Sequence, residues 1–215
     1  MKKLILVITI IFVASAVMPV MAQSTKKESE KDLNKKSMKI ARKDAKKIIK
    51  KGYFVTPGML PIEKQLEKTY IKRNIEDDNG YPKYILASGS SVAGTQTAAQ
   101  MQAISAAKQT LAGLISTNVA QLIENSSATQ QLTLEETTTI TKSISSSKNI
   151  IAEKLGRLIP LSEMYKKIGS DNIQCDVVMA YDSKTAMHMA KQIIRKDLEG
   201  DVEEVGKKLD KMMNF

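Results

Sequence analysis

Residues that could bind a phosphate group gather in one short run, Gly89–Thr95, which lies between an expected strand and an expected helix. The run has two glycines followed by a hydroxyl side chain, as a phosphate-binding loop does. The lysine that such a loop places between its second glycine and the hydroxyl is missing, so the main positive charge for the phosphates is absent. We therefore do not expect nucleotide binding, and we interpret the run as a tight connection built from small residues.

The same run suggests a second chemistry, nucleophilic hydrolysis. Ser91 lies in the pattern Gly-x-Ser-x-Ala, a near match to the Gly-x-Ser-x-Gly turn of serine hydrolases. Its base would be His188, the only histidine, oriented by Asp176 or Asp182. However, one short strand precedes Ser91 and no series of parallel strands is expected, so the scaffold that strains such a turn is missing. A small serine hydrolase centred on Ser91 with His188 is therefore the alternative hypothesis, and we expect no catalytic residues.

Metal-ligating side chains are few in this chain. A zinc site needs three or four nitrogen, sulfur or carboxylate ligands at suitable spacing. His188 and the distant Cys175 supply too few such ligands. We therefore expect neither a metal site nor a cofactor.

Cys175 is the only cysteine, which excludes an intramolecular disulfide. It lies in an alternating stretch in which Ile173, Cys175 and Val177 share one side, while Gln174 and Asp176 lie on the other. Such alternation is typical of a strand with one buried side. We therefore expect Cys175 to be buried and its thiol to react slowly.

The strongest functional signal is a basic segment near the N-terminus. Between Lys26 and Lys51 the chain has 12 lysines and arginines against 4 acidic residues, whereas the sequence from Gly52 to Phe215 has 19 of each. Apolar residues recur at helical spacing within this segment, which predicts an amphipathic helix with a narrow apolar side. The apolar positions are Leu33, Ile40, Ala41, Ala45, Ile48 and Ile49. The candidate surface-contact residues are Lys35, Lys36, Lys39, Arg42, Lys43, Lys46, Lys47, Lys50 and Lys51.

Several roles fit this basic helix. Its lysines could lie on an anionic bilayer, where each basic residue contributes about 1 kcal/mol, or on an anionic glycan of the envelope. A nucleic acid partner is not expected, because an exported protein seldom meets one and no aromatic residue for base stacking precedes Tyr53 in the segment. In the remaining interpretation the helix is solvated and docks its narrow apolar side on the rest of the domain.

The first 22 residues predict export. Lys2 and Lys3 form a basic start, the sequence from Leu4 to Val17 is apolar, and Val20-Met21-Ala22 ends in a small residue before Gln23. The apolar stretch is shorter than the roughly 20 residues that a membrane-spanning helix needs. We therefore expect cleavage after Ala22 and a periplasmic or secreted protein.

The remaining patterns predict an α+β fold. We expect a small, mainly antiparallel sheet of about three strands, packed against two long helices and preceded by the basic helix. The expected helices are 33–51, 61–73, 95–124, 132–149 and 183–212, and the expected strands are 84–91, 154–168 and 173–181, with the last two forming a hairpin. Pro160 indicates an edge or a bulge in the first strand of that hairpin. We divide the chain into a signal peptide (1–22), a polar start and basic helix (23–51), a linker with a short helix (52–82) and an α+β core (83–215).

One resemblance accompanies these patterns. The core from Lys83 to Leu198 has Ser88-Gly89-Ser90 at a strand end, an alanine-rich helix from Ala98 to Leu114, and a Val177–Tyr181 strand that leads into a helix. In these features it resembles the Lpp-twenty-type bacterial surface lipoproteins. The lead-in Gly52-Tyr53-Phe54, followed by Pro57-Gly58-Met59-Leu60-Pro61-Ile62-Glu63, is similar to that of uncharacterised Bacteroidota envelope proteins with such a core. The lipid-attachment cysteine of the family is absent here.

The resemblance implies an α+β envelope module and brings no catalytic residues with it. Together with the export signal and the basic helix, it leads us to expect a non-catalytic exported protein that binds or assembles in the envelope. Its partner would be an anionic membrane or glycan surface, and a homo-oligomer is compatible with this role.

Overall fold

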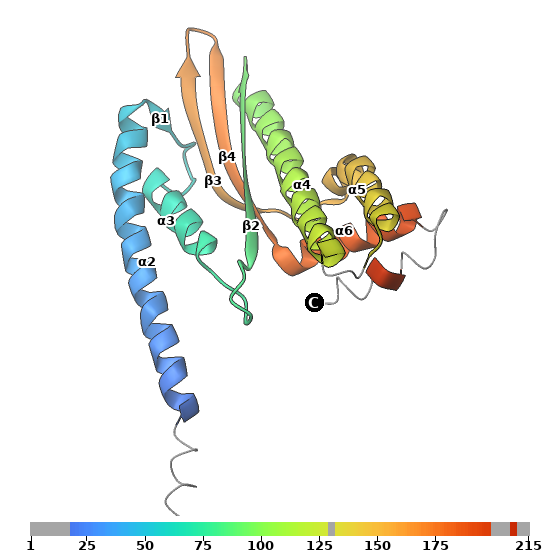
Figure 1. Ribbon diagram of the computed structural model, residues 1–215. Helices are drawn as coiled ribbons and strands as arrows, with labels where there is room; N and C mark the ends of the chain where they lie inside the picture. Colours follow the sequence, from blue (N-terminus) through green and yellow to red (C-terminus); the bar gives the residue numbers. More distant parts are fainter. Residues whose placement is uncertain (1–17, 129–131, 199–206, 210–215) are drawn as a thin grey trace, which may run out of the picture.

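A computed structural model describes residues 18–128, 132–198 and 207–209, and it confirms the α+β fold (Figure 1). The helices are α2 (Met18–Lys50), α3 (Ile62–Arg73), α4 (Gln96–Ala128), α5 (Leu134–Lys154) and α6 (Ser183–Leu198). The strands are β1 (Tyr53–Phe54), β2 (Tyr84–Ala93), β3 (Ile159–Ile168) and β4 (Asn172–Asp182). No helix among the described residues is long and apolar enough to cross a membrane.

The four strands form one antiparallel sheet in the order β1-β3-β4-β2. The expected β3–β4 hairpin is present, and its turn contains Gly169 with a positive φ of 66°. A register shift between Pro160 and Ser162 confirms the bulge that proline indicated, because proline cannot donate to the ladder. The sheet has four strands where the sequence predicts about three. The additional strand, β1, has only two residues, too few for an alternating pattern.

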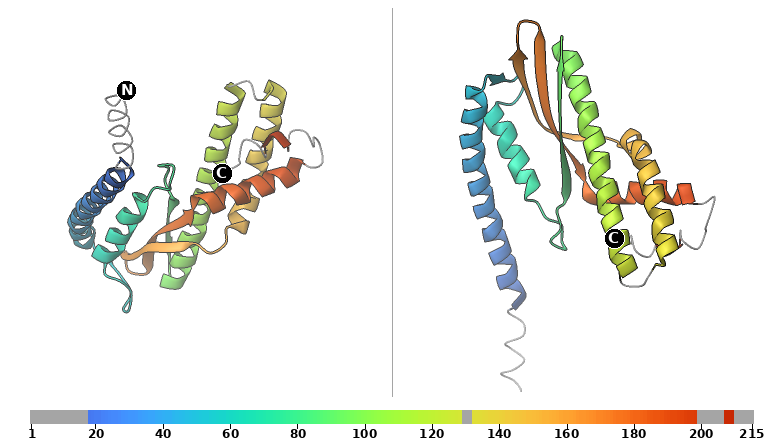
Figure 2. Two further views of the ribbon diagram at one scale, coloured as in Figure 1. Left: turned by 90° about the horizontal axis from the view of Figure 1, so that it is seen from below. Right: turned by 45° about the horizontal axis from the view of Figure 1, so that its top comes forward.

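Helices cover both faces of the sheet (Figure 2). On one face α4 lies against β2 and β4, and it approaches β2 so closely that a Cβ atom at Gly89 would lie 2.0 Å from the carbonyl oxygen of Ala103. On the other face α3 packs on β3, and α2 packs on α3. The small residues near the Gly89–Thr95 run therefore serve close packing of a strand against a helix.

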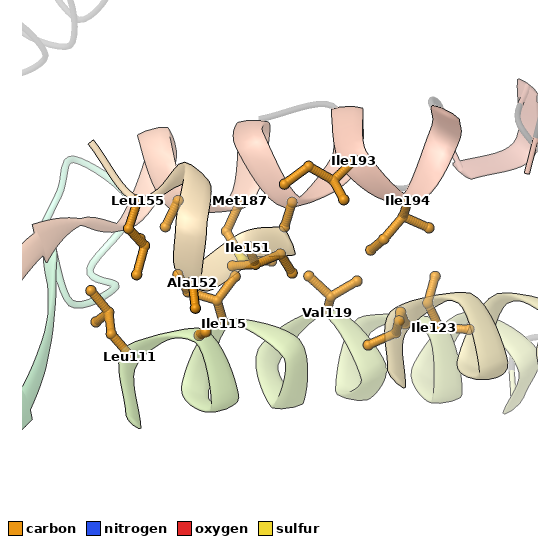
Figure 3. Close-up of a cluster of buried hydrophobic side chains, with 14 of the residues drawn as sticks. Leu111, Ile115, Val119, Ile123, Ile151, Ala152, Leu155, Met187, Ile193 and Ile194 are labelled. Carbon is orange, nitrogen blue, oxygen red and sulfur yellow. The ribbon is translucent and has the colours of Figure 1, made fainter. Parts of the chain in front are cut away.

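The expectation that the two long helices, 95–124 and 183–212, cover the sheet is wrong for the second of them. The described part, α6, leaves the end of β4 and packs mainly against α5 and α4 (Figure 1). Its apolar side joins a helical core with Ile115, Val119, Ile123 and Ile151 (Figure 3). A sheet this small is already covered by α4, so the stripe of α6 is buried between helices.

Two segments differ from their predicted boundaries. Helix α2 begins at Met18, so Gln23–Ser29, expected as a polar start before the helix, is helical, and these seven residues include no glycine or proline. Strand β3 begins at Ile159 rather than at Lys154, because α5 extends to Lys154. The expected continuation of the last helix to 212 lies largely outside the described residues.

The Ser/Thr-rich segment forms the predicted helix in spite of its β-branched residues. The Glu136 amide donates to Oγ1 of Thr133 at 3.2 Å, and the Thr133 amide donates to Oε2 of Glu136 at 2.8 Å. This reciprocal capping satisfies amides that the first helical turn leaves without partners. Further along, the hydroxyl of Thr141 donates to the carbonyl oxygen of Thr137, so this side chain is satisfied within the helix.

Candidate functional site: the lysine face of α2

Helix α2 docks on α3 through a narrow side of small residues. Ala41 is fully buried and Ala45 nearly so, and both contact a cluster that includes Ile62 and Leu66 of α3. Alanine lets two helix backbones approach closely. Ser37, one turn earlier, is also buried and accepts a hydrogen bond from Asn74 at 2.8 Å. The basic helix is therefore a docked layer of the fold.

The expected apolar side of α2 is wider than the side that is buried. Leu33 is 47% exposed, Ile40 53% and Ile49 55%, so these three residues do not belong to the interface with α3. The reason is geometric, since α3 has only 12 residues and contacts α2 along one seam. The interface is built mainly from alanines, with Ile48 packed beside them.

Five lysines occupy the side of α2 opposite the alanines. They recur at intervals of three and four residues, which places them in one row on a helix, and all five are exposed. The row extends about 21 Å along the axis at 1.5 Å per residue. None of the five has an ion pair to another residue in the part of the chain that the structure describes. We call these residues the lysine face: Lys36, Lys39, Lys43, Lys46 and Lys50.

The remaining predicted contact residues flank this row. Lys35 lies 3.6 Å from Asp32, and Lys47 lies 3.2 Å from Asp44. Lys51 follows the helix in an exposed turn. Hydrogen bonds from Tyr70 and Lys47 hold the pKa of Asp44 below its usual value, so this carboxylate stays charged and is already paired.

Arg42 links the flank of α2 to α3. Its Nε atom lies 3.2 Å from Oε1 of Glu67 and 3.3 Å from Oε1 of Glu63. Lys64 donates to the other oxygen of Glu67 at 2.8 Å, and hydrogen bonds from Lys64 and Arg42 lower the pKa of Glu67 against the effect of burial. These contacts fix the rotation of α2 about its own axis and leave the lysine face directed to solvent.

The structure does not bring the hydrolase residues together. Ser91 lies within strand β2 rather than in a turn, and its hydroxyl donates to Oε1 of Gln102 at 2.5 Å. Ser91 pairs with Cys175 of β4. Cys175 lies about 23 Å along the strand from Asp182, the residue just before α6. His188 is exposed on α6 and lies 3.1 Å from Gln192. His188 therefore lies too far from Ser91 to act as its base.

The two aspartates proposed to orient His188 have other partners. Asp176 accepts a hydrogen bond from Ser90, whose hydroxyl lies on the opposite side of β2 from Ser91. Asp182 accepts hydrogen bonds from the amide and hydroxyl of Thr185 at 2.9 Å, which caps the start of α6. No group of three or more histidine, cysteine, aspartate or glutamate side chains that could hold a metal occurs among the described residues.

Cys175 is buried, as the alternation predicts, and its side chain contacts the cluster between α4 and the sheet. Burial raises the pKa of its thiol from 9.0 to about 11. The thiolate is the reactive form of cysteine. The residue is therefore part of the core, and little of its thiol is in the reactive form near neutral pH.

We expect thiol reagents to modify native Cys175 slowly. Raising the pKa from 9.0 to about 11 lowers the thiolate fraction near neutral pH about a hundredfold, and burial slows access further. The rate should be measured by intact mass at pH 7.5 in native buffer and again in concentrated urea. Native labelling as fast as in urea would show that β4 presents its other side to α4.

Searches with this chain found no matching protein-family model, no matching curated protein and no matching solved structure.

Proposed function

We propose that this chain is a non-catalytic exported module of the bacterial envelope that attaches to anionic bilayer surfaces through the lysine face. The observation that carries the proposal is the orientation of α2. Its alanines are buried on α3, so the five lysines project together from the opposite side. Such a row of positive charge, which forms no ion pair with any residue that the structure describes, is suited to a partner that carries many negative charges.

The expected attraction is sufficient for reversible attachment. Each basic residue near an anionic bilayer contributes about 1 kcal/mol, so the five lysines together supply about 5 kcal/mol. Leu33 and Ile40 lie beside the lysine face and are half exposed, which allows their side chains to enter the headgroup region. An attachment of this kind weakens as salt screens the charges.

Export and envelope location are supported by the sequence. The segment 1–22 has the pattern of a cleavable signal, and the resemblance to Lpp-twenty-type surface lipoproteins favours an envelope module. Among the α2 side chains whose burial the structure describes, the docking residues begin at Ser37, so cleavage after Ala22 would leave these contacts with α3 intact. The basic helix would then remain in place at the start of the mature chain.

We expect the double substitution Lys39→Gln and Lys46→Gln to weaken binding to vesicles of phosphatidylglycerol and phosphatidylcholine by about thirtyfold. Two basic residues contribute about 2 kcal/mol near such a surface. Cosedimentation at low and high salt measures the effect. The matched control is Lys142→Gln with Lys154→Gln on α5, which removes the same charge from exposed positions elsewhere and should change binding little.

Equal binding by the two double variants would contradict the role of the lysine face. Binding that does not depend on salt would also contradict it. Retention on an anionic glycan without any binding to vesicles would refute the bilayer as the partner and assign the face to the glycan.

A further inference from the structure

A groove lies at the end of the sheet where α6 begins, away from α2. It is bordered by the loop between α3 and β2, by the C-terminal half of α4 and by the first turns of α6 (Figure 1). Its volume of about 490 Å³ falls within the range of roughly 300–1,000 Å³ that small-ligand sites occupy. The apolar residues that line it are Pro82, Ile85, Leu122 and Met187.

A row of side-chain amides from α4 lines the groove. Asn118, Gln121 and Asn125 follow one another at three and four residues, so they share one side of the helix. They lie on the same side of α4 as Ala103 and Ala107, which pack on the sheet, but nearer the C-terminal end of the helix. The three side chains are exposed and make no hydrogen bond to another described residue. Each presents both a donor and an acceptor to the groove.

An aromatic side chain stands on the other side of the groove. Tyr81 is 69% exposed and belongs to a loop held in a fixed shape. The Asp77 amide donates to the carbonyl oxygen of Tyr81 at 2.7 Å, and the Tyr81 amide donates to Oδ1 of Asp77 at 3.0 Å. Gly80 adopts a positive φ of 82° in this turn. These contacts fix the backbone of the loop, so the point from which the ring projects is set before any ligand arrives, which reduces the entropy lost on binding.

The charges of the residues that line the groove cancel. Asp77 and Lys184 have opposite sign, so the groove has no formal net charge and selects for an uncharged ligand. Amides match ligand groups that both donate and accept hydrogen bonds, which is the property of hydroxyl groups. A flat aromatic ring matches an apolar ligand face made of C–H groups. A sugar ring combines hydroxyls at its rim with such a face.

We propose that this groove binds a neutral oligosaccharide, with the amide row bonding its hydroxyls and Tyr81 stacking on a sugar ring. The row from Asn118 to Asn125 is about 10 Å long, a length that a disaccharide spans. This site is separate from the lysine face and differs from it in ligand charge. One protein would thus contact a charged surface on one side and an uncharged glycan on the other.

Other ligand classes fit the groove less well. Peptides are recognised by sheet edges, apolar helix grooves, proline-binding aromatic grooves or charged clusters, and a row of amides matches none of these. Nucleic acid binding depends on neutralising phosphates with basic residues. Among the residues that line this groove, Lys184 is the only basic one, and Asp77 balances its charge.

The test is a titration of the isotope-labelled full chain with tetramers of N-acetylglucosamine, of β-1,4-linked glucose and of α-1,4-linked glucose. We expect at least one tetramer to shift the side-chain amide resonances of Asn118, Gln121 and Asn125. The triple substitution N118A/Q121A/N125A should weaken that binding at least about tenfold, because each lost hydrogen bond contributes to affinity. Tyr81→Ala should weaken it about tenfold as well.

The matched control is Gln109→Ala, which removes an exposed amide from the same helix outside the groove and should leave binding unchanged. Alanine is the best helix former, so the triple variant should keep its fold, which circular dichroism checks. If no tetramer shifts the three amides at millimolar concentration, the proposal is overturned. It is equally overturned if the triple variant binds like the unchanged protein. Vesicle binding through the lysine face should be the same in all these variants.

Discussion

Gly89→Ala should destabilise the protein by about 3 kcal/mol, the upper end of the usual cost of overpacking. A Cβ atom at this position would lie 2.0 Å from the carbonyl oxygen of Ala103 and 2.5 Å from the amide nitrogen of Ala107. Both atoms belong to the backbone of α4, so no side-chain rotation relieves the clash. The helix would have to move away from β2, which would loosen the alanine cluster between helix and sheet. Urea unfolding followed by circular dichroism measures the loss.

The matched control for this substitution is Gly113→Ala in α4, the helix against which Gly89 packs. There the added Cβ would lie 3.5 Å from the flexible side chain of Lys148, an ordinary contact. Alanine favours a helix over glycine by up to about 1 kcal/mol, so this variant should be slightly more stable than the unchanged protein. A Gly89→Ala protein with unaltered stability would show that α4 lies farther from the sheet.

Ile115→Ala should also cost about 3 kcal/mol, within the usual range for truncating a buried isoleucine. Ile115 is fully buried in the helical core, where α4, α5 and α6 meet (Figure 3). The substitution removes apolar contacts and leaves a cavity that three packed helices can close only in part. The free energy of unfolding in urea again gives the measurement.

The neighbouring residue provides the control for Ile115. Leu114 is 39% exposed, and Leu114→Ala should cost less than about 1 kcal/mol because solvent already reaches its side chain. Similar losses for the two variants would place the interface of α4 with α5 and α6 on a different side of the helix. The pair therefore tests the rotation of α4 as well as its burial.

The parts of the fold that sequence predicts well are those whose pattern repeats locally. Alternation around Cys175 and a glycine-containing turn define the β3–β4 hairpin, and apolar spacing defines α4. Strand β1 cannot be predicted from local sequence, because its two residues pair with Lys166 and Tyr165, which lie more than a hundred positions later in the chain. The packing of α6 on α5 cannot be predicted in this way either, since helical periodicity identifies an apolar side but not the element that covers it.

The candidate sites also have some features that local sequence predicts and others that depend on the tertiary fold. The spacing of the lysines places them on one side of a helix, and this row is present in the structure. The actual docking side of α2 depends on the length and position of α3, so Ile40 is exposed although it follows the apolar pattern. For the groove, the spacing of Asn118, Gln121 and Asn125 in the sequence indicates that these residues share one side of a helix. That this side of α4 faces an opposing loop depends on where the sheet ends, which is a property of the tertiary fold.

Helix α4 belongs to two cores that differ in chemistry. Its first half packs alanines on the sheet, and its second half packs Ile115, Val119 and Ile123 on the other helices. A helix gains its stability cooperatively along its length, so melting of either core would leave half of this 33-residue helix without its packing partners while the other half is still held. Because α4 contributes to both cores, we expect the two cores to unfold together as one cooperative unit.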